Sequence, residues 1–355
     1  MNPQIQKLLG KSGEWLASTG PQNAVVVSSR VRLARNLADF PFMTKAGRAQ
    51  RAELHRLCRE QLLGMSSARP FFYIDMEKTD QVDRQLLVER HLISKQHAFG
   101  DGSRGVAVSD DEAFSIMVNE EDHIRLQVIR SGLQLRECWR EADTLDNALG
   151  QHLRYAFSDR FGFLTACPTN LGTGMRVSVM LHLPALKLTD EIEKVFVAAK
   201  DMHLAVRGLF GEGTEAIGDF YQISNQTTLG RSEEEILTEF ADVILPRLIA
   251  AELSARSVLE QERPLMLDDK IGRAVGLLRN ARLLSSEEAL FGLSHLRLGV
   301  AMGRVANLTM STINRIFLTT QPGHFQRTLG QSLEGEARKA ARASYVRQLM
   351  TPAAG

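Results

Sequence analysis

The sequence predicts an α+β fold in which a mainly antiparallel sheet is flanked by helices and followed by a smaller all-helical domain. Many strand-type segments are joined by connections too short to contain a crossover helix, which favours antiparallel neighbours. After Gly230 the pattern is almost entirely helical, with capping boxes that begin at Ser232 and Ser285. We therefore expect two domains, over residues 1–258 and 259–355, with the boundary inside a long helix.

The individual elements follow from hydrophobic spacing. Spacing near 3.6 residues predicts helices over residues 3–18, 46–64, 143–157 and 190–203. Alternating or β-branched runs predict strands over residues 24–37, 71–76, 105–109, 114–119, 124–129, 163–168, 175–184 and 219–226. The strands outnumber the helices in the first 230 residues, which places a sheet at the centre of the larger domain.

The composition limits the classes of function. The 355 residues are 44% hydrophobic and carry a net charge of +1. This net charge gives the chain no overall electrostatic attraction to nucleic acid or an anionic membrane. Of the 43 basic residues, 33 are arginine, the side chain suited to forked recognition of phosphate. Cys58, Cys138 and Cys167 lack the spacing of a zinc site and cannot all pair, and no segment has the pattern of a signal peptide or membrane span. We expect a cytoplasmic protein without a protein-held metal.

The strand over residues 24–37 carries a regular pair of cations. Its alternation places Ser28, Arg30 and Arg32 on one face and aliphatic side chains on the other. Two arginines on one face of a strand either form an anion-binding site or lie on a solvent-exposed face. The segment VNEEDHIR, at 118–125, then sets four polar residues between two strands, and Arg125 leaves the second strand beside this acidic turn.

Two glycine-containing segments follow. In CPTNLGTGMR, at 167–176, the glycines permit a tight turn with exposed amides, Arg176 opens a strand, and Cys167 is either a reagent or a small buried hydrophobe. The segment VRGLFGEGTEAIGD, at 206–219, carries Arg207 and Glu212 among four glycines, as in a mobile lid or a surface connection.

Taken together, these segments require a ligand that binds several arginines and a reaction that uses carboxylates. A nucleoside triphosphate meets the first requirement, although the P-loop and the protein-kinase motifs are missing from the sequence. A guanidinium group meets the second, because it becomes a nucleophile only when a base removes its proton.

The segments SSRVRLARN, NEEDHIR, CPTNLGTGMR, and RGLFGEGTEA with QISNQ resemble the signature segments of the ATP:guanidino phosphotransferases, the family of creatine and arginine kinases. They occur in the family's order between residues 28 and 226. The resemblance implies a guanidino-kinase catalytic domain that uses ATP, with Mg²⁺ bound through the nucleotide phosphates. It also implies Glu121 as the catalytic base, Glu212 as a second carboxylate and Cys167 as a thiolate beside it.

The resemblance further implies a set of ATP-binding residues: Ser28, Ser29, Arg30, Val31, Arg32, His91, Arg125, Arg176, Val177, Ser178, Val179, Met180, Arg207, Gly208, Leu209, Phe210 and Gly211. His91 belongs to this set through the segment VERHLIS. Taken alone, His91 could equally be a polar residue at the end of a helix.

The branch of the family follows from what surrounds these segments. Only 27 residues precede Ser28, where kinases of small guanidines carry a helical domain, and a long helical pattern follows residue 260. The chain thus resembles the bacterial protein-arginine kinases. That resemblance implies phosphorylation of protein arginines, which marks proteins for Clp degradation and inactivates a heat-shock repressor. It also implies an McsA-type activator, a ClpC-type unfoldase and a homodimer.

The segment RKAARA, at 338–343, resembles the phosphoarginine receptor motif of that branch. Arg338 and Arg342 share one helix face, which suits forked recognition of phosphate, and the site would also include Ala343. Lys339 replaces the family's aspartate, so an arginine-rich surface helix is an alternative. Two alternatives for the whole protein are a kinase of free arginine or another small guanidine, and a non-catalytic adaptor that binds phosphoarginine.

Overall fold

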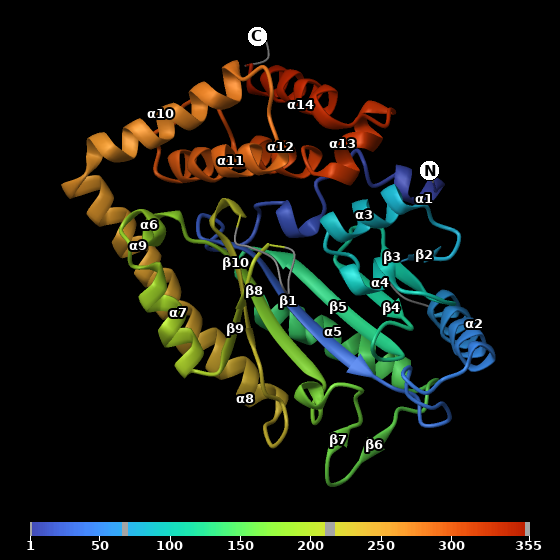
Figure 1. Ribbon diagram of the computed structural model, residues 1–355. Coiled ribbons are helices and arrows are strands. Elements are labelled where there is room, and N and C mark those ends of the chain that lie inside the picture. The colour runs from blue at the N-terminus through green and yellow to red at the C-terminus, as the bar shows by residue number, and fades with distance from the viewer. Residues whose placement is uncertain (1, 66–69, 210–216, 352–355) are drawn as a thin grey trace.

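The computed structural model describes residues 2–65, 70–209 and 217–351 (Figure 1). Its centre is an eight-stranded sheet with the order β2-β3-β4-β5-β1-β8-β10-β9, in which every neighbouring pair is antiparallel. The strands are β1 (Val26–Arg35), β2 (Phe71–Asp75), β3 (Gly105–Ser109), β4 (Phe114–Val118), β5 (Ile124–Ser131), β8 (Met175–His182), β9 (Leu204–Arg207) and β10 (Phe220–Asn225). This confirms the predicted fold class.

One face of the sheet is apolar and forms the main core. Val31, Leu126 and Val177 are fully buried on adjacent strands, because aliphatic residues occupy alternate positions of β1, β5 and β8. Among the helices that contribute to this core are α2 (Arg48–Gly64), α5 (Leu135–Gly150), α8 (Glu233–Thr238) and α9 (Leu245–Glu262). The opposite face of the central strands carries the polar residues.

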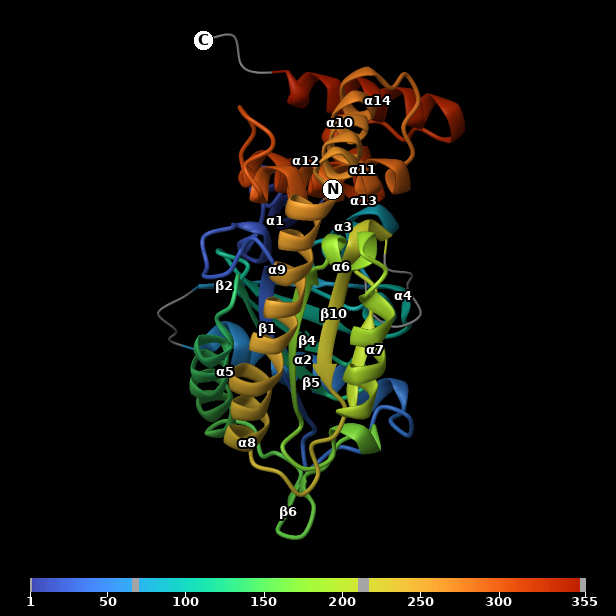
Figure 2. The same cartoon turned by 90° about the vertical axis from the view of Figure 1, so that its left-hand side faces the viewer.

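The C-terminal helices cover one end of the polar face (Figures 1 and 2). They are α10 (Pro264–Asn280), α11 (Ser286–Ala301), α12 (Met310–Thr319), α13 (Pro322–Leu329) and α14 (Gly335–Met350). Their apolar residues form a second core with Ile129, Met180 and Phe220 of the sheet. The helical path is interrupted at Arg263, whose backbone has φ −133° and ψ 42°, and α10 begins directly after it at a proline.

The N-terminal segment differs from its prediction. Instead of one helix over residues 3–18, the chain forms α1 (Pro3–Gln6) and a single 3-10 turn, η1 (Glu14–Leu16). Gly13 separates them with a φ of +75°, a conformation that ends a right-handed helix.

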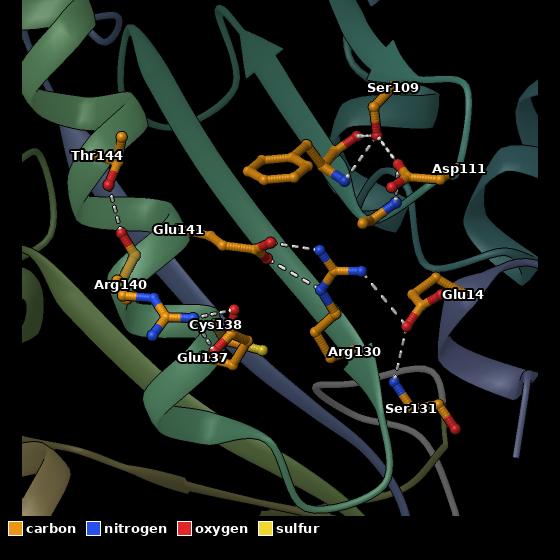
Figure 3. A network of polar contacts seen from close by, with 12 residues as sticks. Glu14, Ser109, Asp111, Arg130, Ser131, Glu137, Cys138, Arg140, Glu141 and Thr144 are labelled. Atoms are coloured by element: carbon orange, nitrogen blue, oxygen red, sulfur yellow. Dashed lines mark hydrogen bonds and ion pairs between the residues drawn. The ribbon is translucent and has the colours of Figure 1, made fainter. Parts of the chain in front are cut away.

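The 3-10 turn η1 is anchored to the sheet by ion pairs. Arg130 of β5 binds Glu141 of α5 with two nitrogens, and its third nitrogen lies 3.7 Å from Glu14 (Figure 3). The Glu14 carboxylate also accepts a long hydrogen bond, 3.5 Å, from the Ser131 amide. These contacts fix the start of η1 beside the C-terminal end of β5.

Two elements between residues 135 and 168 also differ from their predicted bounds. The helix predicted over 143–157 is α5, which begins eight residues earlier, at Leu135, and ends at Gly150. The strand predicted over 163–168 is reduced to β7 (Gly162–Phe163), which pairs with β6 (Phe157–Ser158). The remaining short elements are α3 (Gln81–Glu89), α4 (Lys95–Phe99), η2 (Pro168–Asn170), α6 (Pro184–Leu188), α7 (Ile192–Asp201), η3 (Ile217–Asp219) and η4 (Glu239–Ile244).

Within the described ranges, no helix is both long and apolar enough to cross a membrane.

Candidate active site

Five arginines from four strands lie on the polar face of the sheet. They are Arg30 and Arg32 of β1, Arg125 of β5, Arg176 of β8 and Arg207 of β9. Strand register brings them together, since Arg32 lies opposite Gln127 on one side and opposite Arg176 on the other. The prediction that β1 presents its two arginines on one face agrees with this register.

Two adjoining cavities open onto this arginine row. The larger cavity, about 490 Å³, is lined by Glu121, Cys167, Thr169, Asn170 and Gln226 together with arginines of the row. The smaller cavity, about 270 Å³, is lined by His91, Ser94, Lys95, Glu120 and Gln222 and by apolar residues. Four residues line both cavities: Arg32, Gln96, Arg125 and Arg207.

The electrostatics of the row favour a polyanion. Burial and the charges of Arg176, Arg207 and Arg125 together lower the pKa of Arg30 to about 10. Burial and the charge on Arg30 likewise hold the pKa of Arg32 well below its usual value. Arg30 remains protonated at neutral pH, so the unfavourable crowding of positive charge is relieved when an anion with several negative oxygens binds.

The two glutamates of the β4–β5 turn have different environments. Arg125 holds both of them, with Nη1 2.5 Å from Glu120 and Nη2 2.9 Å from Glu121. The Glu120 side chain is only 1% exposed and accepts a 2.5 Å hydrogen bond from Ser94. Burial alone would raise the pKa of Glu120, but Arg125 and Ser94 outweigh it and hold that pKa below its ordinary value. Glu121 is 34% exposed and faces the larger cavity.

Asp122 and His123 hold the turn in place. Asp122 accepts hydrogen bonds of 2.7 Å from the Asn36 side chain and from the Ala166 amide. The Leu37 amide donates to Nδ1 of His123, so the proton is on Nε2, which lies 3.0 Å from a backbone carbonyl. The acidic turn is thereby tied to β1 and to the chain just before Cys167.

Cys167 lines the larger cavity at the start of η2. Its side chain is partly exposed, and its Sγ lies 3.0 Å from the Thr169 hydroxyl. The alternative of a fully buried cysteine is therefore wrong, and the catalytic role of Cys167 stays a prediction. The turn that follows needs glycine at position 174, because φ is +65° and a Cβ there would lie 2.6 Å from the Ala34 carbonyl oxygen.

His91 lines the smaller cavity just after the end of α3. Its backbone has φ +58°, and its carbonyl accepts a 2.7 Å hydrogen bond from the Gln127 side chain. Burial and the charges of Arg30 and Arg32 together lower the pKa of His91 to about 3. The interpretation as a polar residue at a helix end agrees with this position, and a contact with nucleotide stays a prediction.

The other predicted ATP-binding residues fall into four groups. Ser28, Ser178 and Met180 share the polar face with the arginines, whereas the side chains of Ser29, Val31, Val177 and Val179 alternate to the opposite, buried face. Gly208 and Leu209 follow β9, and Leu209 packs in the second core. Phe210 and Gly211 lie outside the described residues, as does Glu212, the predicted second catalytic carboxylate.

The residues of the RKAARA segment lie on α14 in different environments. Arg342 is buried, and its Nε and Nη1 donate to the carbonyls of Thr320 and Leu284 at 3.0 and 3.1 Å. Ala343 is also buried, Arg338 is half-buried and Lys339 is exposed. Two of the donors of Arg342 are therefore occupied by backbone, and this position is not part of a surface face.

The sequence-based reasoning missed several cavity residues. Gln127 alternates in phase with Arg125 on β5, so the same period could have identified it. Gln222 lies opposite Arg207 of β9, a pairing that depends on strand register. Gln96 and Lys95 begin the short helix α4, and no local pattern relates them to the arginine row. Across the described ranges, no group of three or more histidine, cysteine or carboxylate side chains could hold a metal ion.

Family models match the chain in two parts. Residues 53–255 match the model of the ATP:guanido phosphotransferase C-terminal catalytic domain. Residues 264–354 match the model of the protein-arginine kinase McsB C-terminal domain.

Curated relatives match over nearly the full length. A protein-arginine kinase of Symbiobacterium thermophilum is 46% identical over 338 residues, covering 94% of this chain and 95% of the relative. A protein-arginine kinase of Moorella thermoacetica is 44% identical over 350 residues, covering 96% and 98%.

Solved structures share the fold of the larger part. The duplicated taurocyamine kinase of Schistosoma mansoni with bound transition-state analogue components superposes with a TM-score of 0.61 at 29% identity, over 69% of this chain and 35% of that one. Lombricine kinase superposes with a TM-score of 0.58 at 28% identity, over 67% and 68%.

Proposed function

The chain belongs to the ATP:guanido phosphotransferase family, among its protein-arginine kinases, and we propose that it transfers the γ-phosphoryl group of ATP to arginine side chains of other proteins. The observation that carries this proposal is the row of five arginines with Glu121 at its edge, in one pair of joined cavities. The cations suit a triphosphate, and the half-exposed carboxylate suits a guanidinium.

The arginine row binds and orients the triphosphate. Arg30 and Arg32 lie at the centre of the sheet, with Arg125 on one side and Arg176 and Arg207 on the other, so phosphate oxygens can be reached from three directions. Mg²⁺ bound to the phosphate oxygens of the nucleotide would add positive charge beside the arginines. The arginines disperse the negative charge that moves to the leaving oxygen.

Glu121 acts as the base for the attacking guanidinium. It accepts a proton from the substrate nitrogen as the N–P bond forms, and the bond from the γ-phosphorus to the bridging oxygen breaks to release ADP. Arg125 keeps the carboxylate oriented from 2.9 Å. Cys167, on the wall of the same cavity, and Glu212 are proposed to hold the guanidinium in line.

We further propose the cellular setting that the family membership suggests. The catalytic domain would span residues 1–258. Residues 259–355 would mediate homodimer formation and bind phosphoarginine through Arg338 and the part of the buried Arg342 guanidinium that does not donate to the Thr320 and Leu284 carbonyls. In the cytoplasm, modified proteins would be passed to a Clp protease through a ClpC-type unfoldase. An McsA-type activator and a heat-shock repressor would be further partners.

The test is a phosphorylation assay with the purified chain. The chain is incubated with Mg·ATP and an arginine-rich protein, and acid-labile phosphate on nitrogen is located by mass spectrometry under neutral conditions. We expect phosphoarginine on the protein. Phosphate on free arginine with none on protein would place the chain with the small-guanidine kinases instead, and binding of phosphoarginine without any transfer would make it an adaptor.

A further inference from the structure

Helix α13 of the C-terminal region packs along α3 of the catalytic region. Glu89, the last residue of α3, caps the start of α13: its carboxylate accepts the amides of Gly323 at 2.8 Å and His324 at 3.0 Å. The same carboxylate also lies 2.8 Å from Nδ1 of His324. The side chains of Glu89 and His324 are almost completely buried, so the catalytic and C-terminal regions share a buried polar contact.

The ring of His324 continues this contact to Arg90. Nε2 of His324 lies 3.1 Å from Nη1 of Arg90. Arginine only donates, so Nε2 must accept, and Nδ1 must carry the proton that is donated to Glu89. Burial lowers the pKa of His324, which agrees with a neutral ring. Glu112 holds the remainder of the Arg90 guanidinium at 2.5 and 2.6 Å.

Arg90 immediately precedes His91. The side chain of His91 has a contact of its own with Trp15. The ring of Trp15 meets the His91 ring edge-on, with centroids 4.3 Å apart. Phe317 of α12 lies 6.0 Å from Trp15 on the C-terminal side. The 3-10 turn that carries Trp15 is itself fixed through Glu14 (Figure 3).

The backbone of His91 has an uncommon conformation that the surrounding contacts hold in place. A non-glycine residue with φ +58° is uncommon, and it persists where the surrounding structure holds it. Backbone hydrogen bonds at the end of α3 close the turn, from His91 N to Val88 O at 2.9 Å and from Leu92 N to Leu87 O at 3.0 Å. The Gln127 side chain binds the His91 carbonyl, and the Trp15 ring packs against the His91 ring. Trp15 and the preceding residue, Arg90, each contact a C-terminal helix, through Phe317 and His324.

We propose that His324 and Trp15 are positioning residues that set His91 at the smaller cavity, so that the helices beyond Pro264 complete the nucleotide end of the site. This inference rests on the proposed function, because it treats the smaller cavity as part of the ATP site. His324 positions His91 through its contact with the Arg90 guanidinium, and Trp15 positions it through the edge-on contact between the two rings. Neither residue lines the cavities described above.

The test compares two histidine-to-asparagine variants. In His324→Asn, the amide nitrogen takes the place of Nδ1 and keeps the bond to Glu89, but nothing reaches Arg90. His152→Asn, at an exposed position, is the matched control. We expect His324→Asn to raise both the Kd of Mg·ATP and its KM roughly tenfold while kcat at saturation changes little. In a Trp139→Phe background, the emission of Trp15 should shift on ATP binding in the parent and less in His324→Asn.

Two further variants keep the idea open to refutation. Arg327→Gln removes the ion pairs to Asp80 and Asp83 at the other end of the same helix pair, so an equal rise in Kd would show general loosening and overturn the route through Arg90. If His324→Asn does not fold, His324→Gln supplies an amide oxygen near Nε2, and a Kd above the parent's would overturn the proposal. A parental Kd in folded His324→Asn would also overturn it. Failure of the unmodified chain to bind Mg·ATP would instead overturn the proposed function.

Discussion

Replacing Glu121 by glutamine removes the proposed base and leaves the arginine row in place. Arg125 keeps its 2.5 Å ion pair with Glu120, and the glutamine oxygen can still accept from Arg125. The Kd of Mg·ATP should therefore stay within about threefold of the parent value. A positioned base contributes about 10²–10⁴-fold, or about 3–5 kcal/mol of activation free energy, so transfer should fall by that factor.

The matched variant is Glu120→Gln, one residue earlier in the same turn. Glu120 is buried against Arg125 and Ser94, so losing its charge should lower the free energy of unfolding by about 1–3 kcal/mol and weaken ATP binding. Single-turnover measurement of acid-labile phosphate, calorimetry with Mg·ATP and urea unfolding separate the three effects. Turnover of Glu121→Gln within tenfold of the parent, or a larger rate loss in Glu120→Gln, would refute the assignment.

Three other predictions concern the scaffold. Gly174→Ala, with φ +65° and a Cβ forced against β1, should lower the free energy of unfolding by about 1–3 kcal/mol, and more than Gly230→Ala, where φ is +77° but no atom lies within 4 Å; equal urea midpoints would contradict the clash. Asp146→Ala should lower it by about 3–5 kcal/mol, because the buried Arg35 guanidinium loses its 2.7 Å partner, and a loss below about 1 kcal/mol would contradict this. Burial lowers the pKa of His97 to about 4, so between about pH 6.5 and pH 4 this side chain is protonated in the unfolded chain and neutral in the folded chain, and its contribution makes the stability fall as the pH falls. His97→Gln should reduce that slope by about 1.4 kcal/mol per pH unit, measured by urea unfolding across this range, and an unchanged slope would exclude the histidine.

The period of β1 made part of the site predictable. Alternation alone places Arg30 and Arg32 on one face, and the adjacent acidic turn places Glu121 near Arg125. Strand register, which determines that Arg32 lies opposite both Gln127 and Arg176, depends on long-range pairing and is not encoded in any short segment.

Other features depended on interactions that no local pattern contains. Gln96 reaches both cavities from a short helix, and Glu89 and His324 meet across more than two hundred residues. The amphipathic spacing of residues 3–18 was misleading because Gly13 adopts a positive φ and the segment docks on the sheet and α12 instead of forming its own helix.

The interruption at Arg263 divides the sequence but not the packing. Ile129, Met180 and Phe220 belong to the catalytic sheet, yet their apolar partners come from α11, α12 and α14. A chain cut at that point would expose this surface to water and leave the Glu89 carboxylate without the helix it caps. The two regions are therefore expected to melt together as one cooperative unit, and a duplication or recombination event that moved the catalytic segment alone would also need a new cover for the end of its sheet.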